Sequence, residues 1–513
     1  MRQVYMFLDW GDGWRSVNGH TGDVAALDGF GIQWGTDDME TQPDPSVLSF
    51  RLIDRDGWLT ANATRLAGAK VCVRMAGEPT WRDTQRMDAA TWAQLTGSVR
   101  DLHRIVPASP PNAVGADDAT TLFVGIVATG GEATPRRDGG WLLELSASSR
   151  MILWKRLAKQ GPTSSDARLA ELHWVGSLST RLAELNRRAQ QVGAPQADTT
   201  GFYVDEATPA PYKTDNYPDQ LSILHASYSH AVARPLWYEI PDGDHSRLGG
   251  MPMGDSYFLS ADTAGHLAAY HKSDDPVPGV PARLVIIEDD GKLTIPEPVT
   301  QFVIKGKKAA VDNDGKLQFD ESELTVDASA ELPDNLADTQ SSYTFDSDMV
   351  TVDETGGAWK AVGGTTFALG SDGMFIRWLI QALDERLRPG TVVFDSRKLD
   401  PAEYARLYVT ACTAPLVFEG MSSRDLIVAD GRPATGGVWA PLGGTLTYEW
   451  INGTPVLRNE VNLWPLCAPP GLTRRWSDMD GWPVTWAQCD MTLAEFTLIL
   501  NYQTDTEQEG TQQ

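Results

Sequence analysis

Cysteine, long apolar runs and positive charge are all scarce in this sequence of 513 residues. It has only four cysteines, at positions 72, 412, 467 and 489, and none of them form a C-x-x-C metal or redox motif. We therefore expect reduced, mostly buried thiols. No stretch approaches the ~18 consecutive apolar residues of a membrane-spanning helix, and Asp9 interrupts the short apolar start that a signal peptide would need. The sequence predicts no membrane span and folding in a cytoplasm.

The 43 lysines and arginines are outnumbered by 69 aspartates and glutamates, which gives a net charge of −26. A chain of this charge lacks the broad basic surface with which proteins bind nucleic acids or anionic membranes. The acid is also unevenly spread, because residues 271–360 hold 8 bases and 19 acids and residues 317–359 hold 11 acids and no base. Residues 271–360 are therefore strongly acidic as a whole.

The motifs of the common catalytic and nucleotide-binding sites are also missing. The sequence has no G-x-S-x-G, H-E-x-x-H, G-x-x-x-x-G-K-[ST] or G-x-G-x-x-G. Residues 312–315 superficially suggest a calcium loop, but the first glycine comes at position four instead of six, so a hairpin turn is favoured. A Cys–His pair or a pair of carboxylates that meet only in space stays open. We name no catalytic, cofactor or metal residues, expect no cofactor, and predict that the chain is not an enzyme.

Turn signals and short alternating runs are plentiful. Ten Asp-Gly and two Asn-Gly steps supply the positive φ angles of tight turns. In one run Val71, Val73 and Met75 alternate with Cys72 and Arg74, and a period of two predicts a half-buried strand. Residues 445–457 carry the same alternation around an Asn-Gly step, which predicts a β-hairpin. The fold class we predict is mainly β with a few helices, in several domains.

Three helices are expected. Leucines at i, i+4 and i+7 predict the first between Ser177 and Gln191, and a second begins after Pro218 with Asp219 as its cap. A third is predicted over residues 376–387, before Pro389. The first two lie in a stretch that we expect to form a small α+β middle domain.

An acidic strand is the one candidate site. Residues 323–332 alternate apolar and polar positions, so a strand would present Glu323, Asp327 and Glu331 on one face. One interpretation is an ordinary solvated strand face. The other is a surface that repels polyanions such as DNA.

Tryptophan is abundant, with 18 residues, several of them beside turns. Such rings can stack on sugars or can hold hairpins against a core, and the alternating runs around them favour the second role. The tryptophans beside turns are Trp10, Trp14, Trp34, Trp58, Trp141 and Trp482.

The order of several segments resembles a known family. IQWG at residues 32–35 is followed by QPDPSVLSFRLIDRDG at 42–57, AKVCVRM at 69–75, LFVGIV at 122–127 and WLLELSASSRMILWKRL from Trp141. Near the other end stand GGTLTYEWINGTPVLRNEVNLWPL from Gly443 and PVTWAQCDMTLAEF from Pro483. This layout resembles the minor tail proteins of actinobacterial phages, a group of tail hub and tail-tip proteins. It covers the first ~160 and last ~70 residues by pattern, without an invariant motif.

The resemblance implies a structural protein of the virion, assembled in the host bacterial cytoplasm and located at the tip of a long non-contractile tail of the siphovirus type. It implies a tail-hub-like β-barrel over residues 1–160, an α+β middle domain over 161–270 and one or more β-rich domains over 271–513. It also implies a homotrimer around the DNA exit path, in contact with the distal tail, tape measure and receptor-binding proteins of the baseplate. DNA would pass during genome ejection without specific binding, with Glu323, Asp327 and Glu331 as candidates to face the lumen.

Three other functions remain as alternatives. Distal tail rings share such β-barrel beginnings, although the helices of the middle segment favour a hub. A carbohydrate-binding protein for host recognition is compatible with the tryptophan content. A cell-wall hydrolase is the least favoured, because no lysozyme-like or peptidase-like segment is recognisable.

Overall fold

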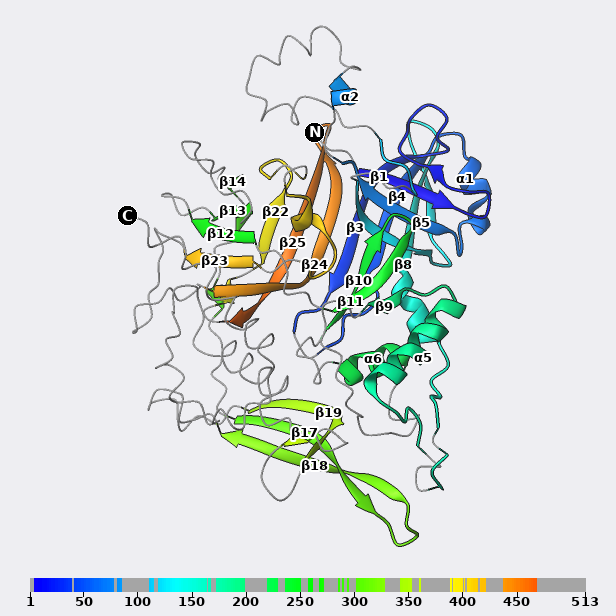
Figure 1. Ribbon diagram of the computed structural model, residues 1–513. Coiled ribbons are helices and arrows are strands. Elements are labelled where there is room, and N and C mark those ends of the chain that lie inside the picture. Colours follow the sequence, from blue (N-terminus) through cyan, green and yellow to red (C-terminus); the bar gives the residue numbers. More distant parts are fainter. Residues whose placement is uncertain are drawn as a thin grey trace.

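The computed structural model describes more than half of the chain, mostly as strands. The described residues are 4–38, 41–77, 81–84, 110–114, 119–163, 165–167, 172–198, 219–228, 236–250, 257–261, 267–271, 285–286, 288–289, 293–294, 301–327, 342–352, 359–360, 388–389, 391–399, 401, 404–413, 416–420 and 437–467. The predicted third helix, Glu331 and the segment from Pro483 lie outside these residues. The mainly β fold class is confirmed (Figure 1).

The first part of the chain forms a ring of hydrogen-bonded strands. The neighbours run β3–β4–β8–β6–β5–β1–β2. An isolated bridge between Asn18 and Ala26 then joins the chain after β2 to the start of β3, so the two edges of the curled sheet meet. The strands are β1 (Val4–Asp9), β2 (Arg15–Ser16), β3 (Ala26–Gly35), β4 (Val47–Asp54), β5 (Lys70–Met75), β6 (Thr120–Val127) and β8 (Trp141–Ser149). A short strand, β7 (Glu132–Pro135), extends the hairpin with β8 beyond the ring.

Later strands form a second ring. β12 (Tyr257–Ala261) pairs with β13 (Leu267–His271), which pairs with β14 (Val285–Ile286). One residue later β15 (Glu288–Asp289) pairs with β22 (Val392–Asp395). The ring continues through β25 (Thr454–Cys467), β24 (Gly437–Ile451) and β23 (Leu416–Gly420), and β23 returns to β12.

The two rings share a seam between β3 and β24. Tyr448 to Gly443 of β24 pair with Phe30 to Gly35 of β3, so strands from opposite ends of the sequence lie side by side (Figure 1). Glycine makes this close approach possible: a Cβ on Gly35 of β3 would lie 2.0 Å from the Leu442 carbonyl oxygen of β24. The predicted 445–457 hairpin is confirmed, and its turn uses Asn452 and Gly453 with φ of 51° and 76°.

A mixed α/β unit follows the first ring. It holds the 3-10 helix η3 (Arg150–Arg156), α5 (Leu178–Gln191) and α6 (Gln220–Tyr228), with a small sheet of β9 (Gln196–Asp198), β10 (Trp237–Asp242) and β11 (His245–Gly250). The Ser177 hydroxyl accepts from the Thr180 N–H, and Asp219 accepts from the Ser222 N–H at 2.8 Å. Both predicted helices are therefore confirmed with their caps. A separate hydrophobic core, which includes Trp154 and Trp174, holds the unit together.

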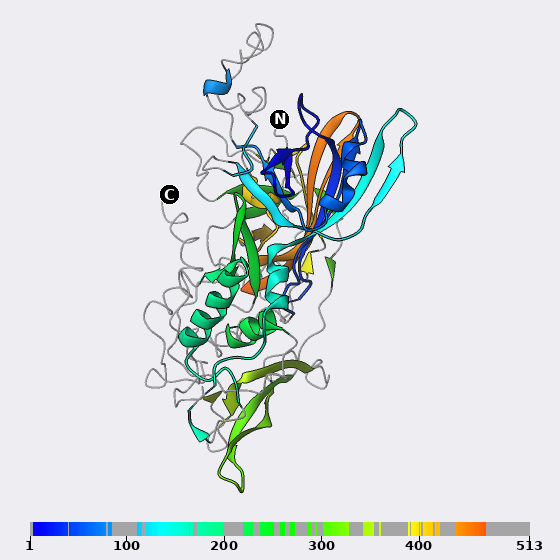
Figure 2. The ribbon, with the colours of Figure 1, turned by 90° about the vertical axis from the view of Figure 1, so that its right-hand side faces the viewer.

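Two smaller sheets and several short helices complete the described structure. β17 (Gln301–Val311), β18 (Leu317–Asp327), β19 (Ser342–Val352) and β20 (Trp359–Lys360) form a four-stranded sheet, and β16 (Leu293–Thr294) pairs with β21 (Arg388–Pro389). The β17–β18 hairpin projects at the opposite end of the molecule from the first ring's helix α1 (Figures 1 and 2). The short helices are α1 (Trp58–Ala61), η1 (Ala63–Arg65), α2 (Trp81–Thr84) and η7 (Ala405–Tyr408).

The prediction that β5 is half-buried was wrong. Cys72 and Arg74 are buried as well as the apolar face of the strand. The reason is a second layer over the outer face, where the Cys72 thiol donates to the Gly243 carbonyl oxygen at 3.3 Å and the Arg74 guanidinium donates to the carbonyl oxygens of Asn112 and Ala119. These loops are distant in sequence, so alternation within the strand gave no sign of them.

Candidate functional site

The predicted acidic residues fall on the projecting sheet. Glu323 lies within β18, Asp327 is the last residue of β18, and Glu331 lies beyond the described residues. The structure therefore brings two of the three onto one strand, four positions apart. Whether they face a lumen stays a prediction.

The strand beside them is basic, which the sequence analysis missed. In the antiparallel register Lys305 is paired with Glu323, whereas Gln301 is paired with Asp327. Farther along, Lys307 is paired with Glu321. Opposite charges at paired positions stabilise a sheet. Glu323 is therefore paired in register with a lysine, whereas Asp327 is paired with an uncharged glutamine.

The turn of this hairpin is the segment that superficially suggested a calcium loop. The Asp312 carboxylate accepts from the N–H groups of Asp314 and Lys316 at 2.9 and 2.8 Å, and Gly315 has a φ of 75°. The predicted hairpin turn is confirmed, because the aspartate stabilises the backbone of the turn itself.

A group of buried hydrogen bonds connects β3 of the first ring to β25 and η7 beside the second ring. The Trp34 indole of β3 donates to the Asn459 amide oxygen of β25 at 3.3 Å. The Asn459 amide nitrogen in turn donates to the Leu407 carbonyl oxygen of η7 at 2.8 Å. A little farther along, the Thr410 hydroxyl donates to the Leu122 carbonyl oxygen of β6 at 2.8 Å. These bonds therefore connect both rings through groups that are satisfied without water.

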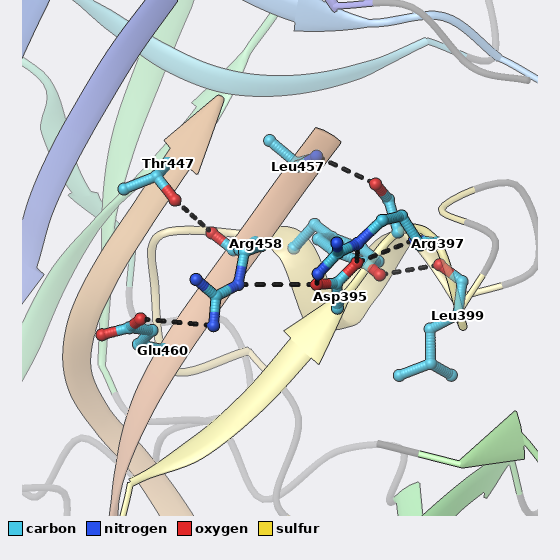
Figure 3. Close-up of polar contacts among 9 residues, drawn as sticks. Asp395, Arg397, Leu399, Thr447, Leu457, Arg458 and Glu460 are labelled. Carbon is cyan, nitrogen blue, oxygen red and sulfur yellow. Dashed lines mark hydrogen bonds and ion pairs between the residues drawn. The ribbon is translucent and has the colours of Figure 1, made fainter. Parts of the chain in front are cut away.

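A buried carboxylate braces β22 against β25 (Figure 3). The side chain of Asp395 is fully buried, and it accepts from the Arg397 N–H and Nε at 2.9 Å each. The Arg458 Nε of β25 lies 3.5 Å from the same carboxylate. Burial alone would raise the pKa of Asp395, but the bonds and charges of the two arginines outweigh it and lower that pKa. The carboxylate is therefore charged and structural.

The middle unit is attached at both rings. The Tyr238 hydroxyl of β10 donates to the Leu442 carbonyl oxygen of β24 at 2.8 Å, and burial raises the pKa of this tyrosine well above its usual value. The neighbouring Glu239 accepts from the Met151 N–H at 2.7 Å and from the Ser246 hydroxyl. Burial raises the pKa of Glu239 despite these bonds. These bonds lie within the unit. Its bond to the first ring is made by the Gly243 N–H, between β10 and β11, which donates to the Thr121 hydroxyl of β6 at 2.9 Å. The unit thus bridges β6 and the seam.

The tryptophans beside turns divide into two groups. Trp34 is buried in the seam, as the interpretation of hairpin-holding rings predicts. Trp58 and Trp141, by contrast, are 39% and 37% exposed. Trp482 lies outside the described residues.

The described residues offer no metal centre, since no group of three or more His, Cys, Asp or Glu side chains among them could hold an ion. Cys72 and Cys412 are free and buried, and burial raises the pKa of the Cys72 thiol to about 12. No helix within the described part of the chain is long and apolar enough to cross a membrane.

No protein-family model matches the chain, and no curated protein sequence matches it. Solved structures do match over most of its length. The chain is similar to a tail protein from Neisseria meningitidis MC58 (8% identity, 89% of this chain and 96% of that chain, TM-score 0.41). It is also similar to prophage tail protein gp18 from Listeria monocytogenes EGD-e (10% identity, 89% and 94%, TM-score 0.36). A third is the E. coli c3393 protein, described as a type VI secretion component similar to T4 tail proteins (8% identity, 88% and 78%, TM-score 0.36). Likeness at this level does not carry a function to the chain.

Proposed function

We propose that the chain is a structural component of the tip of a long non-contractile phage tail, most specifically a tail hub or minor tail protein. The observation that carries the proposal is the pair of strand rings joined at the β3–β24 seam, with an α/β unit that is bonded to β24 and to β6. Hub proteins, which the sequence resembles, have a mixed domain between two barrels. The segments that carry the resemblance, around residues 32–57 and from Gly443, meet at this seam.

The arrangement suits assembly around an axis. Three copies with two rings each would present six rings, and this number matches a sixfold tail tube. The proposed partners are further copies of the chain and the distal tail, tape measure and receptor-binding proteins. The proposed role is to connect these proteins, without catalysis. The three domain ranges, 1–160, 161–270 and 271–513, stay a prediction.

The oligomeric state tests this function. Mass measurement of the purified full chain, and of isolated tail tips, is expected to give a trimer with large interfaces. A strictly sixfold ring would favour the distal-ring alternative. Immunogold labelling of virions that misses the tail tip would contradict the proposal altogether.

The acidic strand has a proposed part in the passage of DNA. Negative charge along the exit path would repel the phosphate backbone and prevent sticking. Replacing Glu323, Asp327 and Glu331 together with lysine is expected to slow genome ejection, most at low salt, where screening is weakest. Ejection kinetics of mutant particles at two ionic strengths test this, and unchanged rates would leave the strand a solvated surface.

A further inference from the structure

We propose that four side chains on the first ring, Arg55, Trp58, Arg137 and Trp141, form an interface that receives the acidic segment 317–359 of a second copy of this chain. We name these four side chains the Trp–Arg rim. The inference rests on the proposed self-association and says which surfaces of two copies meet.

The rim is built on two turns that pack closely against each other. One turn follows β4, and the other joins β7 to β8. A Cβ on Gly140 would lie 2.5 Å from the Asp54 carbonyl oxygen, and a Cβ on Gly57 would lie 3.5 Å from the Trp141 indole. The buried Asp54 carboxylate accepts from the N–H groups of Gly57 and Thr60 at 3.1 and 2.8 Å. The backbone beneath the rim is therefore preorganised in the absence of a partner.

The aromatic part of the rim is exposed but supported from behind. Trp58 and Trp141 are two of the six large apolar side chains that are exposed among the described residues. The Trp58 ring lies 5.7 Å from the ring of Trp10, which packs against the main core. Exposed apolar groups collected on a rigid base indicate an interaction surface. Tryptophan in particular is enriched among the residues that dominate binding energy.

The two charged side chains of the rim are arginines that are open to solvent. Arg55 and Arg137 are exposed, and within the described part of the chain neither makes an ion pair. The neighbouring Arg136, in contrast, is held by Asp138 at 2.9 Å. Guanidinium groups bind carboxylates with two parallel hydrogen bonds and shed water more readily than ammonium groups. Tryptophan and arginine together are thus suited to an acidic protein segment.

The chain itself contains such a segment. Residues 317–359 have 11 acids and no lysine or arginine, and β18 and β19 belong to this stretch. The sheet of β18 and β19 lies at the opposite end of the molecule from α1, where the rim begins (Figures 1 and 2). A contact between the two surfaces must therefore join different copies. Such a contact is heterologous, the type that closes into a ring around an axis.

Self-association of the purified full chain, measured by sedimentation or mass photometry over a concentration series, tests the proposal. Two double variants, R55E/R137E and W58A/W141A, should each raise the concentration of half-assembly by about tenfold or more. The matched control is R15E/W450A, which changes an exposed arginine and an exposed tryptophan elsewhere and should assemble like the wild type. Circular dichroism identifies any variant that fails to fold. If R55E/R137E fails to fold, R55Q/R137Q is tested in its place. If W58A/W141A fails to fold, the single variant Trp141→Phe is tested in its place.

A charge exchange identifies the occupant. A chain with D334K/D338K should associate poorly, and a chain that carries R55E/R137E together with D334K/D338K should regain association, because every contact in a ring of three then joins opposite charges again. Rim variants that assemble like the wild type would overturn the interface while leaving the proposed tail role intact. Loss of assembly in D334K/D338K without recovery in the combined variant would overturn the acidic segment as occupant. A monomeric wild-type chain would instead contradict the proposed function itself.

Discussion

The buried Asp395 brace makes a quantitative prediction, because the chain contains an exposed copy of the same pair. Asp395 and Arg397 are joined through Nε to Oδ1 at 2.9 Å, and Arg136 and Asp138 are joined in the same way at 2.9 Å. The two pairs differ in burial, since the Asp395 side chain is fully buried and that of Asp138 is 67% exposed. Comparing Asp395→Asn with Asp138→Asn therefore measures the effect of the buried setting of Asp395, which includes its contact with Arg458.

The magnitude follows from what the substitution leaves behind. Removing one partner of a fully buried pair costs about 3–5 kcal/mol. Here Arg397 and Arg458 remain 45% and 29% exposed and can regain water, so Asp395→Asn should lower the free energy of unfolding by about 2 kcal/mol. Asp138→Asn should change it by no measurable amount. Because the pKa of Asp395 is lowered, the stability it gives is complete above the unfolded pKa and is lost as the pH falls below it.

Urea unfolding at pH 7, followed by tryptophan fluorescence, gives both numbers. Equal effects of the two substitutions would refute the argument from burial. A neutral Asp395→Asn would show that Arg397 and Arg458 need no carboxylate to hold β22 against β25.

Three further predictions concern the seam, a surface pair and the projecting hairpin. Gly444→Ala should lower the free energy of unfolding by about 2–3 kcal/mol, because the added Cβ would clash with the backbone of β25. The control is Gly31→Ala, whose Cβ would come no closer than 4.0 Å to any atom and should cause no such loss. Urea unfolding measures both variants. Glu184→Gln should cost about 0.5 kcal/mol at pH 7. Two arginines hold the pKa of Glu184 at about 2, so the difference from wild type should fade between about pH 4.5 and pH 2 in thermal unfolding. Glu323→Lys should destabilise the β17–β18 hairpin by up to about 1 kcal/mol, because a lysine is paired with it in register, and Asp327→Lys should not; hydrogen exchange over the hairpin distinguishes them.

Local features of the fold were predictable from the sequence, because neighbouring residues determine them. The Asn-Gly step gives the turn of the 445–457 hairpin, and Ser177 and Asp219 act as the helix caps that their positions predict. Each of these depends on backbone groups within a few residues. Alternation likewise identified β5 of the first ring as a strand, although not the burial of both its faces.

The features that define the candidate site depend on distant residues. Trp34 and Asn459 meet across 425 positions, and nothing near either residue indicates the other. The second layer that buries Arg74 comes from loops that a period of two cannot reveal. The Trp–Arg rim was missed for the same reason, since its two turns are some 80 residues apart and meet only through the packing of Gly57 and Gly140.

The distribution of charge gives the acidic segment its meaning. In β17 and β18 acids and lysines share the same register, so this hairpin is closer to neutral than its acidic strand alone suggests. Asp346 of β19 is likewise paired in register with Lys305, whereas the acids of residues 331–338 have no base near them in the sequence. Within the described part of the chain, Arg55 and Arg137 of the rim make no ion pair. If the segment acts only as an acidic wall that repels DNA, charge reversal at Glu323 or at Asp334 should change the rate of ejection equally, because this repulsion depends on total charge. If the segment binds another copy, reversal at Asp334 should weaken association, and adding R55E/R137E in the same chain should restore it, because such a contact depends on which charges meet. Measuring ejection and association on the same two variants therefore separates the two uses of one acidic segment.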